Sequence, residues 1–557
     1  MMKFSTLCAT YEQLEKTSSH HAMQEVLANL LRKTPAADIS AVCHLTLGEI
    51  APAFSDVNLG MAGKMALRAI ADAFGSDVLA VEREAKQTGD VGLTAEKYAR
   101  AKETLTVETV FTTLHKIASA YGLGSQEKKV ELLSGLFSKS SAIEARYLAR
   151  IALGQLRLGA GDKTLLDALA IALTGDKELR KELEHAYNVL PDIGTIASTL
   201  ATRGEKGIRL ISPRAGMPIQ MMLCQRIAAL DEIEEKAGLP VTIETKYDGE
   251  RVQVHKDGRR VVLFSRRLEN ITAQFPELVL AVSKLKISSC IIEGEIIALD
   301  SRGKILPFQT IMKRRRKHDI AEYARKIPVV LRAFDVLFVN GKSLLGSQYV
   351  KRYAALRRLV KNGKVLTLAE NSVCDTVACA ESFFQRVVRL GSEGIVVKRH
   401  DGVYQAGVRG WNWIKWKPEY LPHMRDTFDL AVVGAFYGRG RRAGVFGALL
   451  CAVYDARRDE FLTLCKLGTG FNDAMLAKLP KMLRMVKVKP ARVVVQDVVP
   501  DVWIAPEKVV EVTGAEVTKS PMHASGYAVR FPRFLRFREK KAEQATTVQE
   551  VAKLAKK

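Results

Sequence analysis

The run Lys246-Tyr247-Asp248-Gly249-Glu250-Arg251 places a lysine at the end of a predicted strand, directly before a turn. A lysine amine attacks phosphorus only when it is deprotonated, so its site must favour the neutral amine through desolvation or neighbouring cations. The sequence offers four cations for this purpose: Arg251, Lys398, Lys415 and Lys417. Lys-x-Asp-Gly alone is a weak signal, but together with the motifs that follow it fits nucleotidyl transfer with Lys246 as the nucleophile.

Three glutamates are candidate metal ligands. Glu293 and Glu295 share one face of a predicted strand, and two carboxylates so close together favour a cation between or beside them. Glu393 adds a third carboxylate in a strand context. Hard oxygen ligands of this kind suit Mg²⁺, which also binds phosphates. Taken alone, Glu293 and Glu295 could equally form a solvated sheet face.

Other candidates are groups that bind phosphate, ribose or base. Lys415 and Lys417 share a face of one predicted strand, where they would meet a triphosphate as point charges. Arg251 and Arg266 could grip phosphate or ribose by paired hydrogen bonds, and Phe334 could offer its ring to a purine. Structural alternatives remain for both types: the lysines could cover the neighbouring tryptophans, and the phenylalanine could occupy an ordinary core position.

The elements around these residues indicate an α+β domain, which we place at 213–424. Residues 241–265 have the pattern of a strand, an Asp257-Gly258 hairpin turn and a second strand. Further strands are expected at 290–300, 328–338, 394–399 and 411–417. Helices are expected at 274–285, 350–361 and 375–390.

Different patterns flank this domain. Over residues 1–212, apolar residues recur at spacings of three and four, which predicts an all-α N-terminal domain of short helices. From 425 to 557, strands are expected at the spacing of a small β-barrel: Leu430–Tyr437, Gly447–Tyr454, Phe461–Leu467 and Ala491–Val499. The predicted fold class is therefore multidomain, α followed by α+β and a C-terminal barrel.

Composition and charge narrow the possible partners. The chain has 557 residues, enough for three or four domains, and 85 Lys+Arg against 61 Asp+Glu leave a net charge of +24. A polyanion is the first partner to expect. Several of the eight cysteines lie in apolar runs, where reduced buried thiols are typical, and no C-x-x-C pair indicates a zinc ribbon. Neither a signal peptide nor a membrane-spanning run is recognised, so a cytoplasmic location is expected.

Seven motifs in this order resemble the signature motifs of the archaeal-type ATP-dependent DNA ligases, which are related to the eukaryotic replicative enzymes. They are Lys246–Arg251, Phe264–Arg267, Ile292–Ile296, Phe334–Phe338, Ser392–Lys398, Trp413–Lys417 and Arg530–Arg538. In addition, Arg146–Arg150 with Gly154–Gly159 is similar to the family's helical DNA-binding domain, and Asp429–Tyr454 resembles its oligonucleotide-binding barrel. The resemblance implies an all-α DNA-binding domain, an α+β adenylation (nucleotidyltransferase) domain and a C-terminal OB-fold β-barrel.

The resemblance also implies roles for individual residues. Lys246 would carry the adenylate. The adenine would be held by Glu244 and Phe334, and the ribose or phosphate region by Arg251, Arg266 and Glu295. The phosphates would bind to Arg409, Lys415 and Lys417, and Mg²⁺ to Glu295 and Glu393.

A C-terminal arginine motif orients pyrophosphate in that family. Here it corresponds to Arg530, Arg533, Arg536 and Arg538, with Arg536 and Arg538 as the expected pyrophosphate-orienting pair. The family usually continues with an acidic residue and a lysine. This chain departs from that pattern, because Lys540 replaces the acid while Lys541 matches the lysine.

The implied activity is ATP-dependent sealing of nicks in duplex DNA through a lysine–AMP intermediate, in replication, repair and recombination. The implied form is a monomer, with a sliding clamp as a candidate partner. Two alternatives stay open. An RNA ligase or capping-type guanylyltransferase shares the lysine chemistry, although the large helical domain argues against both. A non-catalytic DNA-binding protein of the same fold would explain the charge but not the lysine and carboxylates together.

Overall fold

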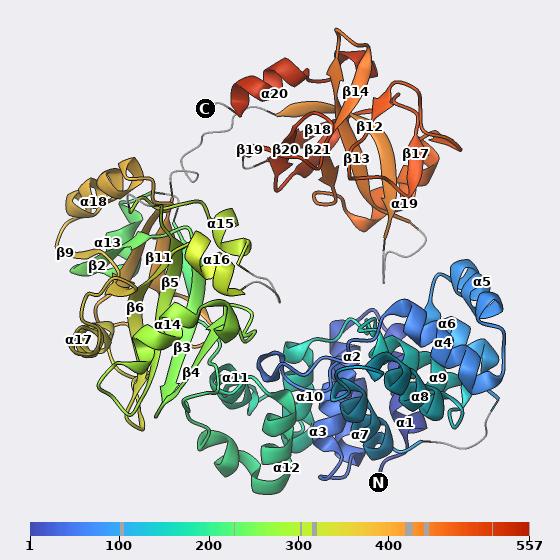
Figure 1. Cartoon of the computed structure of the whole chain (residues 1–557), viewed down its shortest axis with the longest axis horizontal. Helices are drawn as coiled ribbons and strands as arrows, with labels where there is room; N and C mark the ends of the chain where they lie inside the picture. Colours follow the sequence, from blue (N-terminus) through green and yellow to red (C-terminus); the bar gives the residue numbers. More distant parts are fainter. Residues whose placement is uncertain are drawn as a thin grey trace. The chain divides into compact units, whose positions relative to one another are not determined.

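The computed structural model describes residues 1–100, 105–227, 229–300, 303–314, 320–417, 427–438, 445–514 and 516–555. It divides into two compact units, Met1–Lys417 and Pro418–Lys557 (Figure 1). The expected boundary at 424/425 lies outside the described residues.

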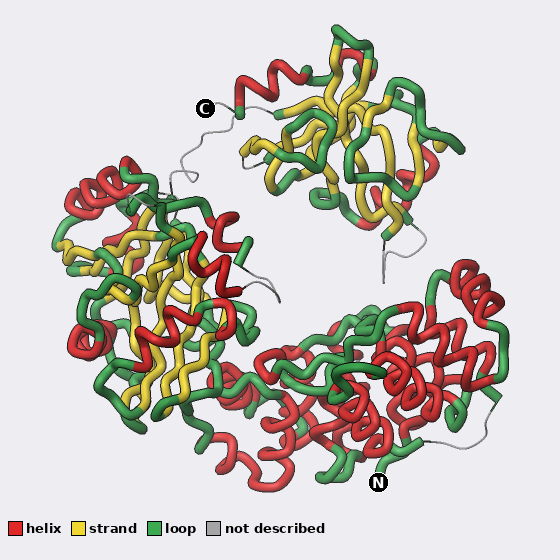
Figure 2. Tube along the Cα trace, in the orientation of Figure 1, coloured by secondary structure: helices red, strands yellow, loops and turns green. Residues whose placement is uncertain are grey.

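Among the described residues up to 210, all regular elements are helices, as Figure 2 shows, and this confirms the predicted all-α region. One hydrophobic core, which includes Phe4, Tyr11 and Leu148, runs through these helices. Their bounds are α1 Phe4–Glu15, α2 His20–Lys33, α3 Ile39–Thr46, α4 Gly63–Phe74, α5 Val78–Thr88, α6 Val91–Tyr98, α7 Val107–Ala118, α8 Ser125–Phe137, α9 Ala142–Ala152, α10 Asp162–Thr174, α11 Arg180–Val189 and α12 Ile193–Arg209.

Helix α9 is held to its neighbours by ion pairs. The Arg146 Nε atom donates to Glu96 on α6 at 2.7 Å. Arg150 Nη2 lies 2.8 Å from Oδ2 of Asp90, the residue that caps the N-terminus of α6. Tyr147 between the two arginines is fully buried. Both guanidinium groups are therefore engaged with carboxylates inside the helical region.

Two sheets form the core of residues 213–417, which confirms the predicted α+β class. The first has the strand order β1-β11-β10-β2-β9, and the second has the order β4-β3-β5-β6-β7 with β8 beside β6. The strands are β1 Leu223–Arg226, β2 Val241–Lys246, β3 Glu250–Asp257, β4 Arg260–Ser265, β5 Ser289–Ala298, β6 Val329–Val339, β7 Lys342–Ser343, β8 Leu366–Leu368, β9 Asn371–Cys374, β10 Gly394–Arg399 and β11 Arg409–Trp416. The helices are α13 Glu232–Ala237, α14 Pro276–Ser283, α15 Phe308–Met312, α16 Ile320–Lys326, α17 Tyr349–Leu359 and α18 Val377–Arg389.

The expected pattern at 241–265 is correct at its hairpin and wrong before it. Strands β3 and β4 pair around the Asp257-Gly258 turn, with Asp257 opposite Arg260. The segment 241–257 is not one strand, however, because β2 belongs to the five-stranded sheet and β3 to the six-stranded sheet. The chain crosses from one sheet to the other between Lys246 and Glu250, and this crossing puts Lys246 at a strand end.

The second unit is a curled sheet consistent with an OB fold, as expected. Strand β12 lies between β17 and β13, and β18 pairs with both β12 and β21. Its elements are β12 Phe428–Tyr437, β13 Phe446–Asp455, β14 Glu460–Leu467, α19 Asp473–Met482, β15 Met485–Val486, β16 Val493–Val494, β17 Val502–Ile504, β18 Val509–Thr513, β19 Glu516–Lys519, β20 Tyr527–Arg530, β21 Arg533–Arg538 and α20 Val548–Leu554.

The expected strand at 491–499 is wrong for most of its length. Only Val493–Val494 pairs in the sheet, parallel to Phe461–Leu462 of β14. The following residues leave the sheet, and the backbone N–H of Asp497 donates to the Met522 carbonyl instead of to a strand.

The cysteines are only partly in the reduced, buried state that the sequence predicts. Cys451 is a free, buried thiol as expected, whereas Cys374 and Cys379 form a disulfide that the spacing did not indicate. None of the helices in the described ranges has the length and apolar character to span a membrane.

Candidate active site

A pocket of about 310 Å³ is lined by residues from both sheets of the unit Met1–Lys417. Lys246 comes from the end of β2, and Glu295 comes from β5 in the other sheet. Seven of the predicted site residues line it: Lys246, Arg251, Arg266, Glu295, Glu393, Arg409 and Lys415. Positions up to 169 residues apart in the chain thus meet around one space.

Two glycines allow the backbone to place Lys246 there. A Cβ atom on Gly249 would lie 2.3 Å from the Ile296 carbonyl oxygen, so only glycine fits the crossing from β2 to β3. A Cβ atom on Gly394 would lie 2.2 Å from the Trp416 oxygen, and this glycine has φ +143°. Gly394 pairs directly with Lys246 across β10 and β2.

Glu393 is the immediate partner of Lys246. Its backbone N–H donates to the Lys246 carbonyl at 3.0 Å, and its carboxylate forms ion pairs with the ammonium groups of Lys246 and Lys417. Lys417 does not line the pocket but reaches the site through this carboxylate. About a quarter of the Lys246 side chain and a fifth of the Glu393 side chain are exposed (24% and 21%), so both remain accessible.

The pocket concentrates positive charge. Burial, together with the nearby charges of Lys246, Arg409 and Arg266, lowers the pKa of Lys415 below its ordinary value. Like charges gathered in one space are unfavourable unless an anion neutralises them. The arrangement is suited to a polyphosphate.

The two strand glutamates have different surroundings. Glu293 is fully buried, and its Oε2 atom accepts a hydrogen bond from Arg251 Nη2 at 2.9 Å. Glu295 lines the pocket, and burial raises its pKa to about 7 although Lys246 and Arg251 act in the opposite direction. The solvated sheet face considered for this pair is therefore wrong for Glu293, which is a buried partner of Arg251.

Arg251 lines the pocket with its guanidinium already partnered. Its Nη1 donates to the Met222 carbonyl at 2.7 Å, and its Nη2 donates to Glu293. It also lies over the ring of Trp413, with 5.2 Å between the guanidinium carbon and the ring centroid. These contacts fix the orientation of the side chain.

Glu244 and Phe334 do not line this pocket; they lie in a buried cluster centred on Lys398. The Lys398 Nζ atom is 2.8 Å from Glu244 Oε2 and donates to the Phe334 carbonyl at 2.9 Å. The Tyr349 hydroxyl donates to Glu244 Oε1 at 2.7 Å, so both carboxylate oxygens have partners. Burial raises the pKa of Glu244, and Lys398 opposes this.

Sequence reasoning missed Tyr349 as a partner of Glu244. It lies 105 residues further along the chain at the first turn of α17, and no spacing rule connects it to β2. A tyrosine at the start of a helix carries no signal of its own, so only the packing of α17 against β6 shows the contact.

The C-terminal arginines lie in the second unit: Arg530 ends β20, and Arg533, Arg536 and Arg538 are on β21. Arg536 is directly opposite Glu511 of β18 and donates to its Oε2 atom at 2.6 Å, while Arg538 Nη1 lies 3.3 Å from the same atom. Lys540, the departure from the family motif, pairs with Asp429 at 2.5 Å. Arg536 nevertheless keeps about two thirds of its side chain exposed (66%).

Metal binding would depend on the two pocket carboxylates. Within the described ranges, no group of three or more His, Cys, Asp and Glu residues is arranged to hold a metal ion. Glu295 and Glu393 line one pocket, and Mg²⁺ is commonly bound by one or two carboxylates together with waters and phosphate oxygens. The donor set therefore fits Mg²⁺ at a phosphate site.

Comparisons with known proteins cover the whole chain. Three family descriptions match it: DNA ligase N terminus at residues 3–170, ATP dependent DNA ligase domain at 221–417 and ATP dependent DNA ligase C terminal region at 442–541. DNA ligase 2 of Thermofilum pendens is 43% identical over 100% of this chain and 97% of the relative. DNA ligase 1 of Methanosarcina acetivorans is 41% identical over 100% of this chain and 99% of the relative.

A solved structure titled "Pmar-Lig_PreS3" covers 96% of this chain and 99% of its own, with a TM-score of 0.56 and 17% identity, a likeness of fold. The matches to the DNA ligases of Thermofilum pendens and Methanosarcina acetivorans, by contrast, are matches in sequence, and they include all of the site residues. The chain belongs to the ATP-dependent DNA ligases.

Proposed function

We propose that this chain seals nicks in duplex DNA through a covalent AMP adduct on Lys246. The observation that carries the proposal is the placement of Lys246 at the end of β2, in a pocket crowded with cations and in contact with Glu393. A neutral amine beside bound phosphates is the arrangement that nucleotidyl transfer to lysine needs.

The reaction has three displacements at phosphorus. Lys246 Nζ loses a proton and attacks the α-phosphorus of ATP, so that an N–P bond forms and pyrophosphate leaves. An oxygen of the 5′-phosphate at the nick then attacks the same phosphorus and releases the lysine. Finally the 3′-hydroxyl attacks the activated 5′-phosphate, AMP leaves and the phosphodiester is restored.

Different residues of the pocket would serve different parts of this reaction. Glu393 accepts hydrogen bonds from the Lys246 ammonium and is the carboxylate placed beside the proton that must leave. Lys415, Arg409 and Arg266 hold the phosphates through charge. All three line the pocket, and their positive charges repel one another when no phosphate is bound. Mg²⁺ bound by Glu295 and Glu393 would neutralise phosphate charge.

The buried cluster around Lys398 supports base recognition. Lys398 fixes the Glu244 carboxylate and the Phe334 backbone, and its ammonium lies 4.7 Å from the Phe334 ring centroid. In the proposal Glu244 and Phe334 contact the adenine, so Lys398 and Tyr349 act on the base by positioning these two residues.

Several features extend the proposal beyond the site. We place the boundary between the DNA-binding and adenylation domains at 212/213 and that between the adenylation and OB-fold domains at 424/425. The protein would act as a cytoplasmic monomer, with a sliding clamp as a candidate partner, in replication, repair and recombination. The first boundary is supported by the change from helices to sheets after α12.

A nick-sealing assay with ATP, GTP and NAD side by side tests the function. We expect sealing and covalent labelling with ATP and Mg²⁺ and neither with GTP or NAD. Labelling by GTP without sealing would instead identify a capping-type enzyme. Nick binding without any label would identify a non-catalytic DNA-binding protein.

Removal of one pocket carboxylate should weaken catalysis through the metal. Glu295→Gln and Glu393→Gln should each slow sealing on the order of 10²-fold, as expected for loss of one electrostatic group in a site. Each should also raise the Mg²⁺ concentration needed for half-maximal rate. The exposed Glu322→Gln on α16 is the matched control and should change neither quantity. Wild-type rates for both pocket variants in limiting Mg²⁺ would contradict the metal assignment.

A further inference from the structure

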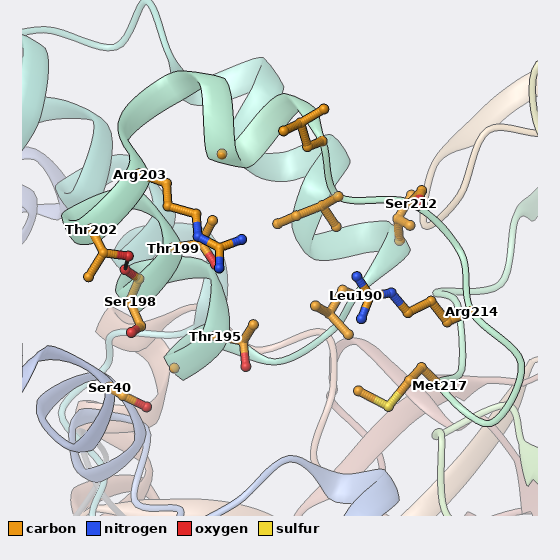
Figure 3. Close-up of a pocket in the computed structure, with 15 residues that line it drawn as sticks. Ser40, Leu190, Thr195, Ser198, Thr199, Thr202, Arg203, Ser212, Arg214 and Met217 are labelled. Carbon is orange, nitrogen blue, oxygen red and sulfur yellow. Dashed lines mark hydrogen bonds between the residues drawn. The ribbon is translucent and has the colours of Figure 1, made fainter.

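A groove of about 490 Å³ lies against α12 and the segment that follows it, within the unit Met1–Lys417 (Figure 3). It shares no lining residue with the nucleotide pocket. Six hydroxyl side chains line it: Ser40, Thr195, Ser198, Thr199, Thr202 and Ser212. Its charged lining residues among those described are two arginines, Arg203 and Arg214, and no carboxylate is present there.

The two arginines reach into the groove from opposite sides, with their guanidinium ends toward its centre (Figure 3). Both residues are exposed, and in the described part of the chain neither guanidinium has an ion-pair or hydrogen-bond partner. Arg209 on the same helix behaves differently, because it pairs with Glu205. Two unpaired guanidinium groups around one space repel each other, and an anion between them would reverse that repulsion.

The backbone of α12 is adapted to this placement of Arg203. Gly204 interrupts the helix with φ 61° and ψ −161°, a conformation that is essentially restricted to glycine. A Cβ atom on Gly207 would lie 2.5 Å from the Arg203 Cβ, so glycine leaves the room that the Arg203 side chain occupies. Gly207 thus leaves room for the Arg203 side chain, and Gly204 breaks the regular helix directly after Arg203.

The segment that follows Arg214 is anchored on the sheet. Two residues after it, the Gly216 N–H donates to His255 Nδ1 on β3 at 3.1 Å, and the Ile219 N–H donates to Gln253 on the same strand at 2.7 Å. Arg203 belongs to the helical region and Arg214 to a segment anchored on the sheet. An anion held by both would therefore connect the two regions where the chain passes from one to the other.

We infer that this groove is a second phosphate-recognition site, separate from the nucleotide pocket. A phosphate group would accept charge-assisted hydrogen bonds from Arg203 and Arg214, with hydroxyl groups such as Thr199 and Ser212 as additional donors. The phosphate could belong to a nucleic-acid backbone or to a free phosphate compound, because the recognising chemistry is the same. The inference does not depend on the role proposed for Lys246.

The test uses the full chain with Arg203→Gln and Arg214→Gln combined. The control is Arg209→Gln, which also removes a positive charge from α12 but lies outside the groove. In the first arm, binding to nicked duplex DNA is measured over a series of salt concentrations. In the second arm, inorganic phosphate is titrated by calorimetry. Thermal unfolding midpoints verify that all three proteins are folded.

A backbone phosphate predicts that the double variant flattens the salt dependence of DNA binding by about one to two units of slope, while Arg209→Gln leaves it unchanged. A free phosphate compound predicts that the double variant loses one class of phosphate site, with at least about ten-fold weaker binding, at an unchanged DNA slope. Either result supports the site. Equal behaviour of wild type and double variant in both arms, or an equal change in the control, would overturn it.

Discussion

Lys246→Ala should show no covalent AMP adduct after incubation with ATP and Mg²⁺, and it should seal no nicks from ATP. The N–P bond forms on the Nζ atom that the substitution removes, and no other lysine of the described site stands at the end of β2 beside Glu393. Binding to nicked DNA should remain nearly unchanged, because one charge in a net +24 contributes little to a contact with many phosphates. Intact-protein mass and DNA retardation give the two measurements.

Lys284→Ala is the matched control for this experiment. Lys284 is exposed beyond the end of α14 and does not line the pocket, so its loss removes the same charge without touching the site. The control should form the adduct at the wild-type rate. A Lys246→Ala protein that still carries AMP would show that a different side chain is the nucleophile.

Much of the candidate site could be predicted because its residues lie in strands with clear patterns. Lys246 was expected at a strand end, and Glu295 and Lys415 were expected on strand faces; the structure places all three around one pocket. Period-two alternation reports which face a residue occupies. It therefore identifies candidate side chains well even when the neighbouring strand is unknown.

The contacts that pattern reasoning could not supply are those between distant elements. The pairing of Glu244 with Tyr349 and the bond from Arg251 to the Met222 carbonyl depend on how separate elements pack. The same limit explains the error at 241–265. Apolar periodicity continues through Tyr247, yet β2 and β3 join different sheets, and sheet membership is decided by partners far away in sequence.

The arginine pair on β21 provides the second large expected effect. Arg536→Ala combined with Arg538→Ala should slow formation of the lysine adenylate by at least about 10³-fold, because each charged donor to a leaving group contributes roughly 10²- to 10³-fold. Sealing of a nick that already carries AMP should be largely spared, since no pyrophosphate leaves in that step. The two rates are measured on the same preparation, with Arg484→Ala, an exposed arginine of the same unit, as control.

Loss of Arg536 and Arg538 could also slow adenylation by destabilising the second unit, and this effect must be separated from an effect on pyrophosphate. Arg536 and Arg538 both contact Glu511, so their removal leaves this carboxylate without its two cations and could weaken the pairing of β18 with β21 in the second unit. Glu511→Gln breaks the same ion pairs but keeps both arginines. If the arginines act on pyrophosphate, Glu511→Gln should form the adenylate at close to the wild-type rate. If Glu511→Gln is as slow as the double variant, the ion pairs serve the fold of the unit and the pyrophosphate assignment is wrong.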